Sequence, residues 1–224
     1  MATAEKNIKK TSLKIITASV LFLVCLFVFS LLMMVVVMNE TDLFDQAVFS
    51  YLEQHMSPAL ANTMQAITFF GDTMFLLPAY CLMAGFLILK KKHRWATDIT
   101  IVALSGELMK HFLKTSFARA RPDQPVFDTL QSFSFPSGHA LSSFILAASI
   151  IYLLWKGNIQ DKWRWTFTIL LLLYSFLVGF SRVFLRYHYA SDVIAGFAFG
   201  YIWVMICLLL LGRFHNSGNS RITE

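Results

Sequence analysis

Residues 15–38 read IITASVLFLVCLFVFSLLMMVVVM, a run without a charged side chain. At about 24 residues, this run is long enough to cross the hydrocarbon core of a bilayer as an α-helix. Lysines precede it, and the following Asn-Glu-Thr-Asp does not resemble the small-residue cleavage site of a secretory signal. The run therefore predicts a first membrane-spanning helix that is retained in the mature protein.

The composition of the whole chain is typical of a membrane protein. Hydrophobic residues make up 57% of the 224 residues and charged residues only 14%, against roughly 25% charged residues in ordinary soluble domains. The net charge of +6 is divided among short clusters between apolar runs, without the basic stripe and interleaved aromatics of a nucleic-acid groove. Nucleic acid is therefore excluded as a partner. The cysteines lie singly in apolar runs and indicate neither disulfides nor a metal site: Cys25, Cys81 and Cys207.

Six membrane-spanning helices are predicted from the apolar runs. Their approximate ranges are 14–38, 70–89, 97–114, 138–155, 164–182 and 192–212. The third is the weakest, because charged residues interrupt it. We therefore predict an all-α polytopic membrane protein with one domain, 14–212, between an N-terminal segment, 1–13, and a tail, 213–224.

A shorter amphipathic helix is predicted between the first and second spans. Apolar residues recur there at helical spacing, as in a helix that lies at the membrane interface: Leu43, Phe44, Ala47, Val48, Tyr51 and Leu52. With six spans, most lysines and arginines fall on the side that carries both termini. The positive-inside rule then places both termini in the cytoplasm and makes the protein a multi-pass component of the inner or plasma membrane.

The basic residues left on the outer side gather in three separated stretches of sequence. Zero or two predicted spans separate any two of these stretches, so all three reach the same, outer membrane face. The stretches are Lys114-(six residues)-Arg121-Pro122, then Phe135-Pro136-Ser137-Gly138-His139, and finally Ser181-Arg182-(five residues)-His188-(three residues)-Asp192.

These stretches predict a binding site for a phosphate-like anion. Lys114, Arg121 and Arg182 supply three cations, and each guanidinium can bind two phosphate oxygens at once. Ser137 and Gly138 stand where a helix begins, and the N–H groups of a helix start attract an anion. Glycine there lets the ligand approach the backbone closely.

Two histidines and an aspartate give this anion site the means for catalysis. His188 and Asp192 are four residues apart, so they share a helix face, and Asp192 could hold one ring nitrogen while the other attacks phosphorus. His139 would donate a proton to the departing oxygen and later take one from water. The cations would stabilise the transferred group, and no carboxylates with metal-ligand spacing lie nearby, so we expect neither a metal nor a cofactor.

The same residues resemble the three signature motifs of the type-2 phosphatidate phosphatase family, which shares its active site with vanadium haloperoxidases and glucose-6-phosphatases. The family pattern is Lys-x6-Arg-Pro, Pro-Ser-Gly-His and Ser-Arg-x5-His-x3-Asp, and this sequence matches every position over roughly residues 40–210. The resemblance implies a phosphohistidine at His188, orientation by Asp192 and leaving-group protonation by His139. It also implies phosphate binding by Lys114, Arg121, Ser137, Gly138 and Arg182. The remaining motif residues would support the site: Pro122, Pro136 and Ser181.

The leading hypothesis is a lipid phosphatase that acts on a phosphomonoester or diphosphate with an apolar tail, in contact with membrane lipids. Phosphatidate and phosphatidylglycerophosphate fit this description. The alternatives are an undecaprenyl diphosphate phosphatase of cell-wall lipid-carrier recycling, and a lipid phosphotransferase in which a hydroxyl replaces water. A transporter or scaffold that only binds the anion is disfavoured, because binding alone needs no His188–Asp192 pair.

Charged residues near the motifs are interpreted as supporting groups. Within the third span, Glu107 and Lys110 are expected to pair. Arg119 and Arg186 lie close to the motifs but outside the pattern, and they are expected to attract lipid headgroups. The turn at residues 69–72 is interpreted only as a helix entrance.

Overall fold

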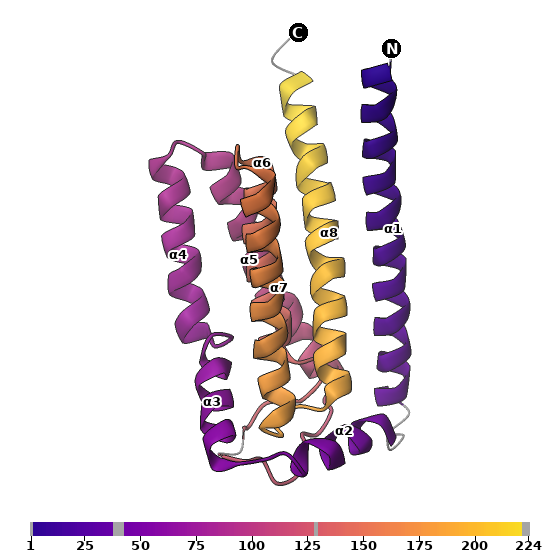
Figure 1. The fold of residues 1–224 in the computed structure, drawn as a ribbon, viewed down its shortest axis with the longest axis vertical. Helices are drawn as coiled ribbons and strands as arrows, with labels where there is room; N and C mark the ends of the chain where they lie inside the picture. The colour runs from indigo at the N-terminus through magenta and orange to yellow at the C-terminus, as the bar shows by residue number, and fades with distance from the viewer. Residues whose placement is uncertain (1, 38–42, 128–129, 221–224) are drawn as a thin grey trace.

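The computed structural model describes residues 2–37, 43–127 and 130–220, and within these ranges it contains eight helices and no strand. The long helices run side by side, both termini lie at one end of the bundle, and α2 lies crosswise at the other end (Figure 1). Residue 38 of the predicted first span and residues 221–224 of the predicted tail lie outside the described residues. The helices are α1 (Ala2–Val37), α2 (Leu43–Glu53), α3 (Pro58–Phe69), α4 (Thr73–Leu89), α5 (His93–Phe117), α6 (Gly138–Lys156), α7 (Asp161–Phe184) and α8 (Ala190–Ser220).

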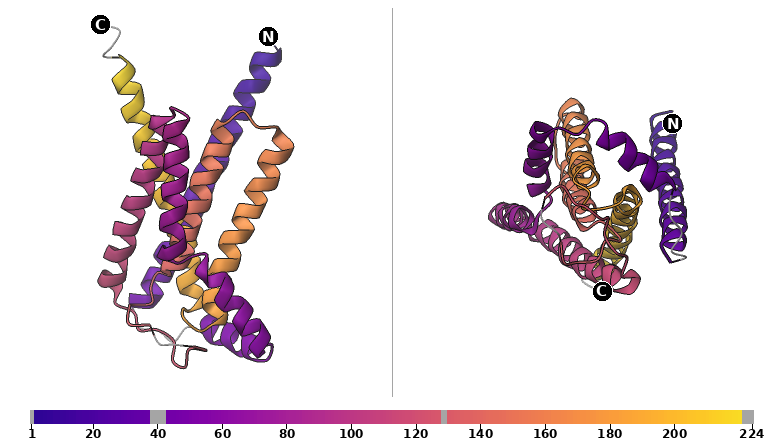
Figure 2. Two further views of the ribbon diagram at one scale, coloured as in Figure 1. Left: turned by 90° about the vertical axis from the view of Figure 1, so that its left-hand side faces the viewer. Right: turned by 90° about the horizontal axis from the view of Figure 1, so that it is seen from below.

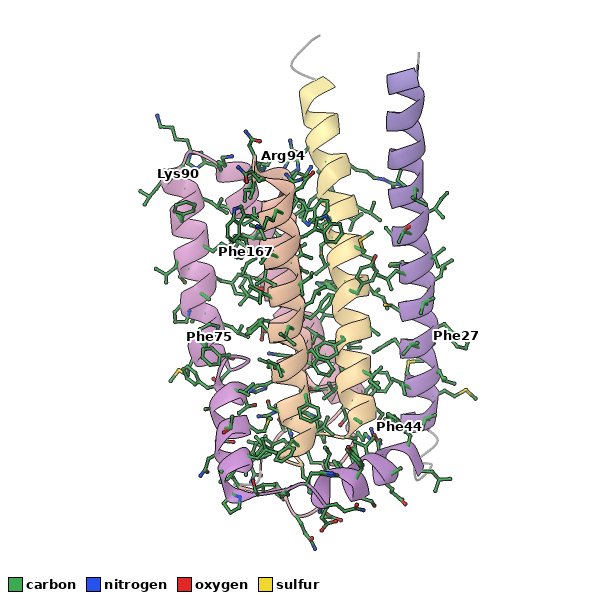
Figure 3. All side chains as sticks on the ribbon, in the orientation of Figure 1. Phe27, Phe44, Phe75, Lys90, Arg94 and Phe167 are labelled. Carbon is green, nitrogen blue, oxygen red and sulfur yellow. The ribbon has the colours of Figure 1, made fainter. Side chains whose placement is uncertain are left out.

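Helix α6 is the centre of the bundle. It packs against α5, α7 and α8 and also contacts α4, whereas α1 packs on α8. Figure 2 shows α1 at the periphery when the bundle is seen along its axis. The outward faces carry apolar side chains that are more than half exposed, including Phe27, Leu82 and Leu108. Phe27 points away from the bundle in Figure 3. Such surfaces are stable when lipid rather than water surrounds them.

The all-α membrane architecture is confirmed by the length and composition of the helices. Five segments are long and apolar enough to cross a membrane: Ile15–Val36, Pro58–Leu89, Gly138–Lys156, Asp161–Phe184 and Ala190–His215. The first of them lies within the first predicted span, and the other four contain the second, fourth, fifth and sixth predicted spans. The third predicted span forms α5, which is not among the five and carries Asp98, Glu107, Lys110 and Lys114. Six crossings therefore stay a prediction.

Helix α3 was not among the helices predicted from the sequence. Ser57 caps this helix, because its Oγ accepts a hydrogen bond from the N–H of Leu60. Pro58 occupies the first turn, where a missing N–H costs nothing. A new helix, α4, begins after Asp72, whose Oδ1 accepts the N–H of Met74 at 2.9 Å. Residues 69–72 are therefore a turn between two helices.

The predicted amphipathic helix exists as α2, but one of its acidic residues is not at the surface. Leu43 and Tyr51 are exposed and Leu52 is buried. Asp45 is only 2% exposed and faces the bundle. The position of α2 at a membrane interface stays a prediction, and the burial of Asp45 indicates an additional internal role.

Candidate active site

Three chain segments converge at the end of the bundle that lies away from both termini. Helix α5 ends at Ala118, whose left-handed backbone (φ 46°) turns the chain into the loop that carries Arg121. Helix α6 begins after Ser137, which caps it, and α7 and α8 are joined by a tight turn that contains His188. The turn and α2 lie at the same end in Figure 1. All three predicted motifs therefore meet there.

A cavity of about 550 Å³ opens between these segments. Lys110 and Asp72 line it in addition to motif residues, so four cations face one carboxylate. This balance favours an anionic ligand. The predicted site residues in the lining are Lys114, Arg121, Gly138, His139, Arg182 and His188.

The two ring nitrogens of His188 face different surroundings. Nδ1 lies 3.5 Å from Oδ2 of Asp192 and 3.3 Å from Oγ of Ser134, whereas Nε2 lies 3.2 Å from Nη1 of Arg121. Because the Ser134 hydroxyl donates to Asp192, it can only accept from the ring. The proton of a neutral His188 therefore sits on Nδ1, and the lone pair of Nε2 faces the cavity, where it accepts from Nη1 of Arg121.

The His188 ring is held in its neutral form by its surroundings. Burial lowers the pKa of His188 well below its usual range, and the positive charges of Arg182, Arg121 and Lys114 lower it further. Since only the neutral imidazole has a lone pair on Nε2, this environment keeps that lone pair unprotonated at neutral pH.

The two arginines of the cavity are fixed by hydrogen bonds within the protein, and Arg182 keeps a donor for a ligand. Arg121 donates from Nε to the Ser132 carbonyl at 2.6 Å and from Nη1 to the Tyr187 carbonyl. Arg182 donates from Nη1 to Thr68 Oγ1 at 2.7 Å. Its buried Nε has no hydrogen-bond partner among the described residues. A buried donor without a partner is costly, so this N–H suits a phosphate oxygen.

Two lysines of α5 lie over the start of α6. Lys110 pairs with Glu107, which confirms the predicted pair, and Ser142 Oγ donates to Glu107 Oε1 at 2.7 Å. Lys114, one turn further along α5, donates to the Phe133 carbonyl. A Cβ at Gly138 would lie 3.0 Å from Lys110 Cδ and 3.5 Å from Lys114 Cε. A bulkier residue there would crowd both lysines and fill the cavity.

His139 reaches the cavity from the first turn of α6 and faces Asp72. Its Nε2 lies 3.9 Å from Oδ2 of Asp72, whose Oδ1 caps α4. A Cβ at Gly71 would lie 2.9 Å from His139 Cδ2, so the turn between α3 and α4 packs directly on the imidazole. The sequence interpretation of this turn as a helix entrance missed its contact with a site residue.

Five motif residues do not line the cavity: Asp192, which lies behind His188, and two serines and two prolines. Ser137 is fully buried, its Oγ accepts the N–H of Ala140 as a helix cap, and its own N–H donates to the Asp192 carbonyl at 3.0 Å. The Ser181 hydroxyl donates to the Val178 carbonyl at 2.7 Å. The side chains of both serines therefore hold the backbone in place, as do the rings of two buried prolines, Pro122 and Pro136.

Arg119 is directed into the protein, so its predicted contact with lipid headgroups was wrong. It donates from Nη1 to Asp192 Oδ1 at 2.6 Å and from Nη2 to Asp45 Oδ2 at 3.2 Å. Arg186 is likewise paired, with Glu53 of α2 at 3.2 Å. No spacing in the sequence relates Asp45 to Arg119, because the two residues meet only through the packing of α2.

Comparisons with known proteins agree with the motifs. Residues 95–215, more than half of the chain, match the PAP2 superfamily. Phosphatidylglycerophosphatase B of Bacillus subtilis (strain 168) is 30% identical over 179 residues, which cover 79% of this chain and 88% of that protein. An undecaprenyl-diphosphatase of Sulfolobus acidocaldarius is 27% identical over 163 residues, covering 70% and 73% of the two chains.

Solved structures show the same arrangement of helices. The crystal structure of a transmembrane PAP2-type phosphatidylglycerolphosphate phosphatase from Bacillus subtilis superposes with a TM-score of 0.73 at 28% identity, covering 89% of this chain and 96% of that one. LpxE of Aquifex aeolicus shares the fold, with a TM-score of 0.61 at 23% identity over 75% of this chain and 97% of that one. This chain belongs to the PAP2 superfamily.

Proposed function

We propose that this PAP2-type membrane lipid phosphatase removes the terminal phosphate of a lipid through a covalent phosphohistidine at His188. The observation that carries the proposal is the asymmetric setting of the His188 ring. Nδ1 faces Asp192 and Ser134, while Nε2 faces Arg121 in a cavity rich in cations. Nδ1 is thereby held as a donor, and Nε2 presents its lone pair to the cavity. A bound phosphate would take the Arg121 donor that Nε2 now accepts and leave Nε2 to attack, as in other activated nucleophiles.

In the first step, Nε2 of His188 attacks phosphorus, a P–N bond forms and the P–O bond to the leaving group breaks. His139 donates a proton to the leaving oxygen. Lys114, Arg121 and Arg182 hold the phosphoryl oxygens and stabilise their charge as the bonds change. Asp192 stabilises the proton on Nδ1 while the ring carries the phosphoryl group.

In the second step, water attacks phosphorus and His139 takes its proton. The P–N bond breaks, its electron pair returns to Nε2, and inorganic phosphate leaves. Over both steps one water is consumed for each phosphate released. Within the described residues no group of three or more His, Cys, Asp or Glu side chains could hold a metal ion. We propose metal independence because three protein cations supply the charge stabilisation.

The surroundings of the cavity support a lipid substrate. An apolar groove of about 350 Å³ lies between α4 and α5, and Thr73 lines both this groove and the cavity. Leu76, Tyr80 and Leu104 form part of its wall. A substrate with its phosphate in the cavity would lay its apolar tail in this groove.

The relatives narrow the choice of headgroup. Their names give phosphatidylglycerophosphate and undecaprenyl diphosphate as substrates of those proteins. We propose phosphatidylglycerophosphate or phosphatidate as the substrate, with undecaprenyl diphosphate as the alternative. The cations would surround only the phosphate that is removed. All three lipids carry such a phosphate, so the cations do not distinguish among them.

The test is phosphate release by the purified protein in detergent micelles from a panel of these three lipids. His188→Ala should abolish release while the protein elutes from size-exclusion chromatography as the wild type does. His55→Ala is the matched control, because the exposed His55 lies in the turn after α2, away from the cavity lining, and its ring contacts Tyr51. Turnover retained in His188→Ala would exclude the phosphohistidine.

The same assay tests metal independence. Activity should survive EDTA and should be blocked by vanadate, which adopts the five-coordinate geometry of the phosphorus during transfer. Loss of activity in EDTA that magnesium restores would show that the three cations are insufficient.

A further inference from the structure

A second network of buried polar groups lies behind the nucleophile, on the side away from the cavity. Asp192 is fully buried, and both of its carboxylate oxygens are occupied. Oδ2 accepts from Ser134 Oγ and from the Tyr189 N–H at 3.0 Å and faces His188, while Oδ1 accepts from Arg119 at 2.6 Å. The orientation of Asp192 therefore depends on Arg119, which does not line the cavity.

Arg119 is the branch point of this network. Its Nη1 also donates to Ser191 Oγ at 2.8 Å, and its guanidinium lies over the Tyr189 ring at 4.1 Å. Its carbonyl accepts the N–H of Ser134 at 2.8 Å. Arg119 thus fixes both neighbours of Nδ1 of His188, one through its side chain and the other through its backbone.

Asp45 connects this branch point to α2. Its Oδ1 accepts the Ser191 N–H at 2.8 Å, and its Oδ2 accepts from the Ser191 hydroxyl and from Arg119. Burying a carboxylate is costly unless charged and polar partners surround it. The partners of Asp45 come from the start of α8 and from the loop after α5, so a residue early in the chain contacts the catalytic end of the bundle.

The charges of this network explain why a second carboxylate is useful. If Arg119 faced Asp192 alone, the pair would be neutral and its pull on the Nδ1 proton would be weak. With Asp45 sharing the guanidinium, two carboxylates surround one cation and a net negative charge is left. That charge is available to the imidazole as it becomes positive during phosphoryl transfer.

We propose that Arg119 and Asp45 are positioning residues of the hydrolysis: Arg119 aligns Asp192 with His188, and Asp45 of α2 holds Arg119. This inference rests on the proposed function, because it assigns support to the same nucleophile. Helix α2 would then support the active site through Asp45, in addition to its predicted position at the membrane interface.

The first test compares Asp45→Asn with Glu53→Gln, which removes the ion pair between α2 and Arg186 in the turn that carries His188. A misplacement of about 1 Å at a reacting group can cost on the order of 10²-fold in rate. We expect kcat to fall roughly tenfold in Asp45→Asn and on the order of 10²-fold in Arg119→Gln, with KM within about twofold of wild type. Glu53→Gln should keep the wild-type kcat.

The second test is the pH dependence of kcat/KM, which simple loss of folded protein does not move. The charged and titratable groups around His188 are Asp192 of α8, Arg182 of α7, His139 of α6, Lys114 of α5, and Arg119 and Arg121 of the loop. Asp45→Asn removes a negative charge, so the acid limb should move to lower pH. Arg119→Gln removes a positive charge, so the limb should move to higher pH.

The outcomes separate this inference from the proposed function. If wild type releases phosphate but Asp45→Asn matches it in kcat and in pH profile, the positioning roles are refuted. Equal losses in Asp45→Asn and Glu53→Gln would show that α2 needs only anchoring, and would refute them as well. If Asp45→Asn does not fold, Arg119→Lys decides. Lysine keeps the charge but lacks the two separate guanidinium nitrogens that bind Asp192 and Asp45, so an unchanged kcat there refutes the proposal. Wild type without phosphate release would overturn the proposed function itself.

Discussion

At the scale of single residues, His188 is prepared by the groups on both sides of its ring. Ser134 and Asp192 fix the proton on Nδ1, and burial with three nearby cations keeps the ring neutral. The neutral ring is the nucleophilic form, so on the acid side activity is lost when His188 becomes protonated. Because the pKa of His188 is lowered, that loss must occur at a pH below the usual histidine range.

The corresponding prediction concerns the acid limb of kcat/KM. The limb should lie below about pH 6.5, the usual pKa of a histidine. The measurement is phosphate release from a micellar lipid phosphate at subsaturating concentration, between about pH 4 and pH 9. A limb at or above that value would show that His188 is not held neutral.

The free energy of unfolding should also decrease as the pH falls. The unfolded chain binds a proton at His188 near pH 6.5, while the folded protein binds it only at lower pH. The contribution of His188 to the free energy of unfolding is therefore complete above about pH 6.5 and declines as the pH falls toward the lowered pKa.

The motif residues could be predicted from the sequence because a phosphate site demands particular side chains at particular spacings. The residues that orient them could not. Ser134 and Arg119 gain their roles through contacts with Asp192, and Asp45 gains its role only because α2 folds back under α8. Nothing in the local pattern around Asp45 separates it from an acidic residue on the water side of an amphipathic helix.

At the scale of helices, the start of α6 depends on a close approach by α8. A Cβ at Gly196 would lie 2.8 Å from the Ser137 carbonyl oxygen and 3.1 Å from the Ala140 Cβ. The nearest atom belongs to the backbone, so α8 would have to shift. The Ser137 N–H that donates to the Asp192 carbonyl would shift with it.

Gly196→Ala should therefore lower both the thermal unfolding midpoint and the rate of phosphate release. Overpacking of this kind typically costs about 1–3 kcal/mol. Gly85→Ala in α4 is the matched control, since nothing lies within 4 Å of its Cβ position. Alanine is favoured over glycine in a helix by about 1 kcal/mol, so Gly85→Ala should be neutral or stabilising. A wild-type midpoint and rate in Gly196→Ala would show that α8 can move away without cost.

The predicted helices agree well with the observed ones where a long apolar run defines them. Residues 138–155 were predicted and α6 spans Gly138–Lys156; residues 164–182 were predicted and α7 spans Asp161–Phe184. Helix α3 was missed because hydropathy alone does not separate a short helix from the polar turn before it. Its capping serine and first-turn proline were the local signals that could have located it.

At the scale of the whole molecule, function depends on the number of membrane crossings. Five segments qualify as spans by length and composition, and α5 runs in the same bundle although charged residues lie along it. Glu107 and Lys110 neutralise each other, and Lys114 lies at the end where the cavity opens. Paired charges and cavity-facing charges are the kinds that a membrane-spanning helix tolerates, so we predict that α5 completes six crossings.

Six crossings place the turn between α6 and α7 on the side of the termini, and α2 with the cavity on the other. Cysteines introduced at Asn158 and at Gln54, both exposed, would report these two sides in a chain whose three native cysteines are replaced. By the positive-inside rule, a membrane-impermeant thiol reagent should label Gln54→Cys in intact cells and label Asn158→Cys only after the membrane is opened. The reverse pattern would put the cavity in the cytoplasm. Labelling of both positions from one side would mean that the segment between them, including α5, crosses the membrane an even number of times, and the prediction of six crossings would then be wrong.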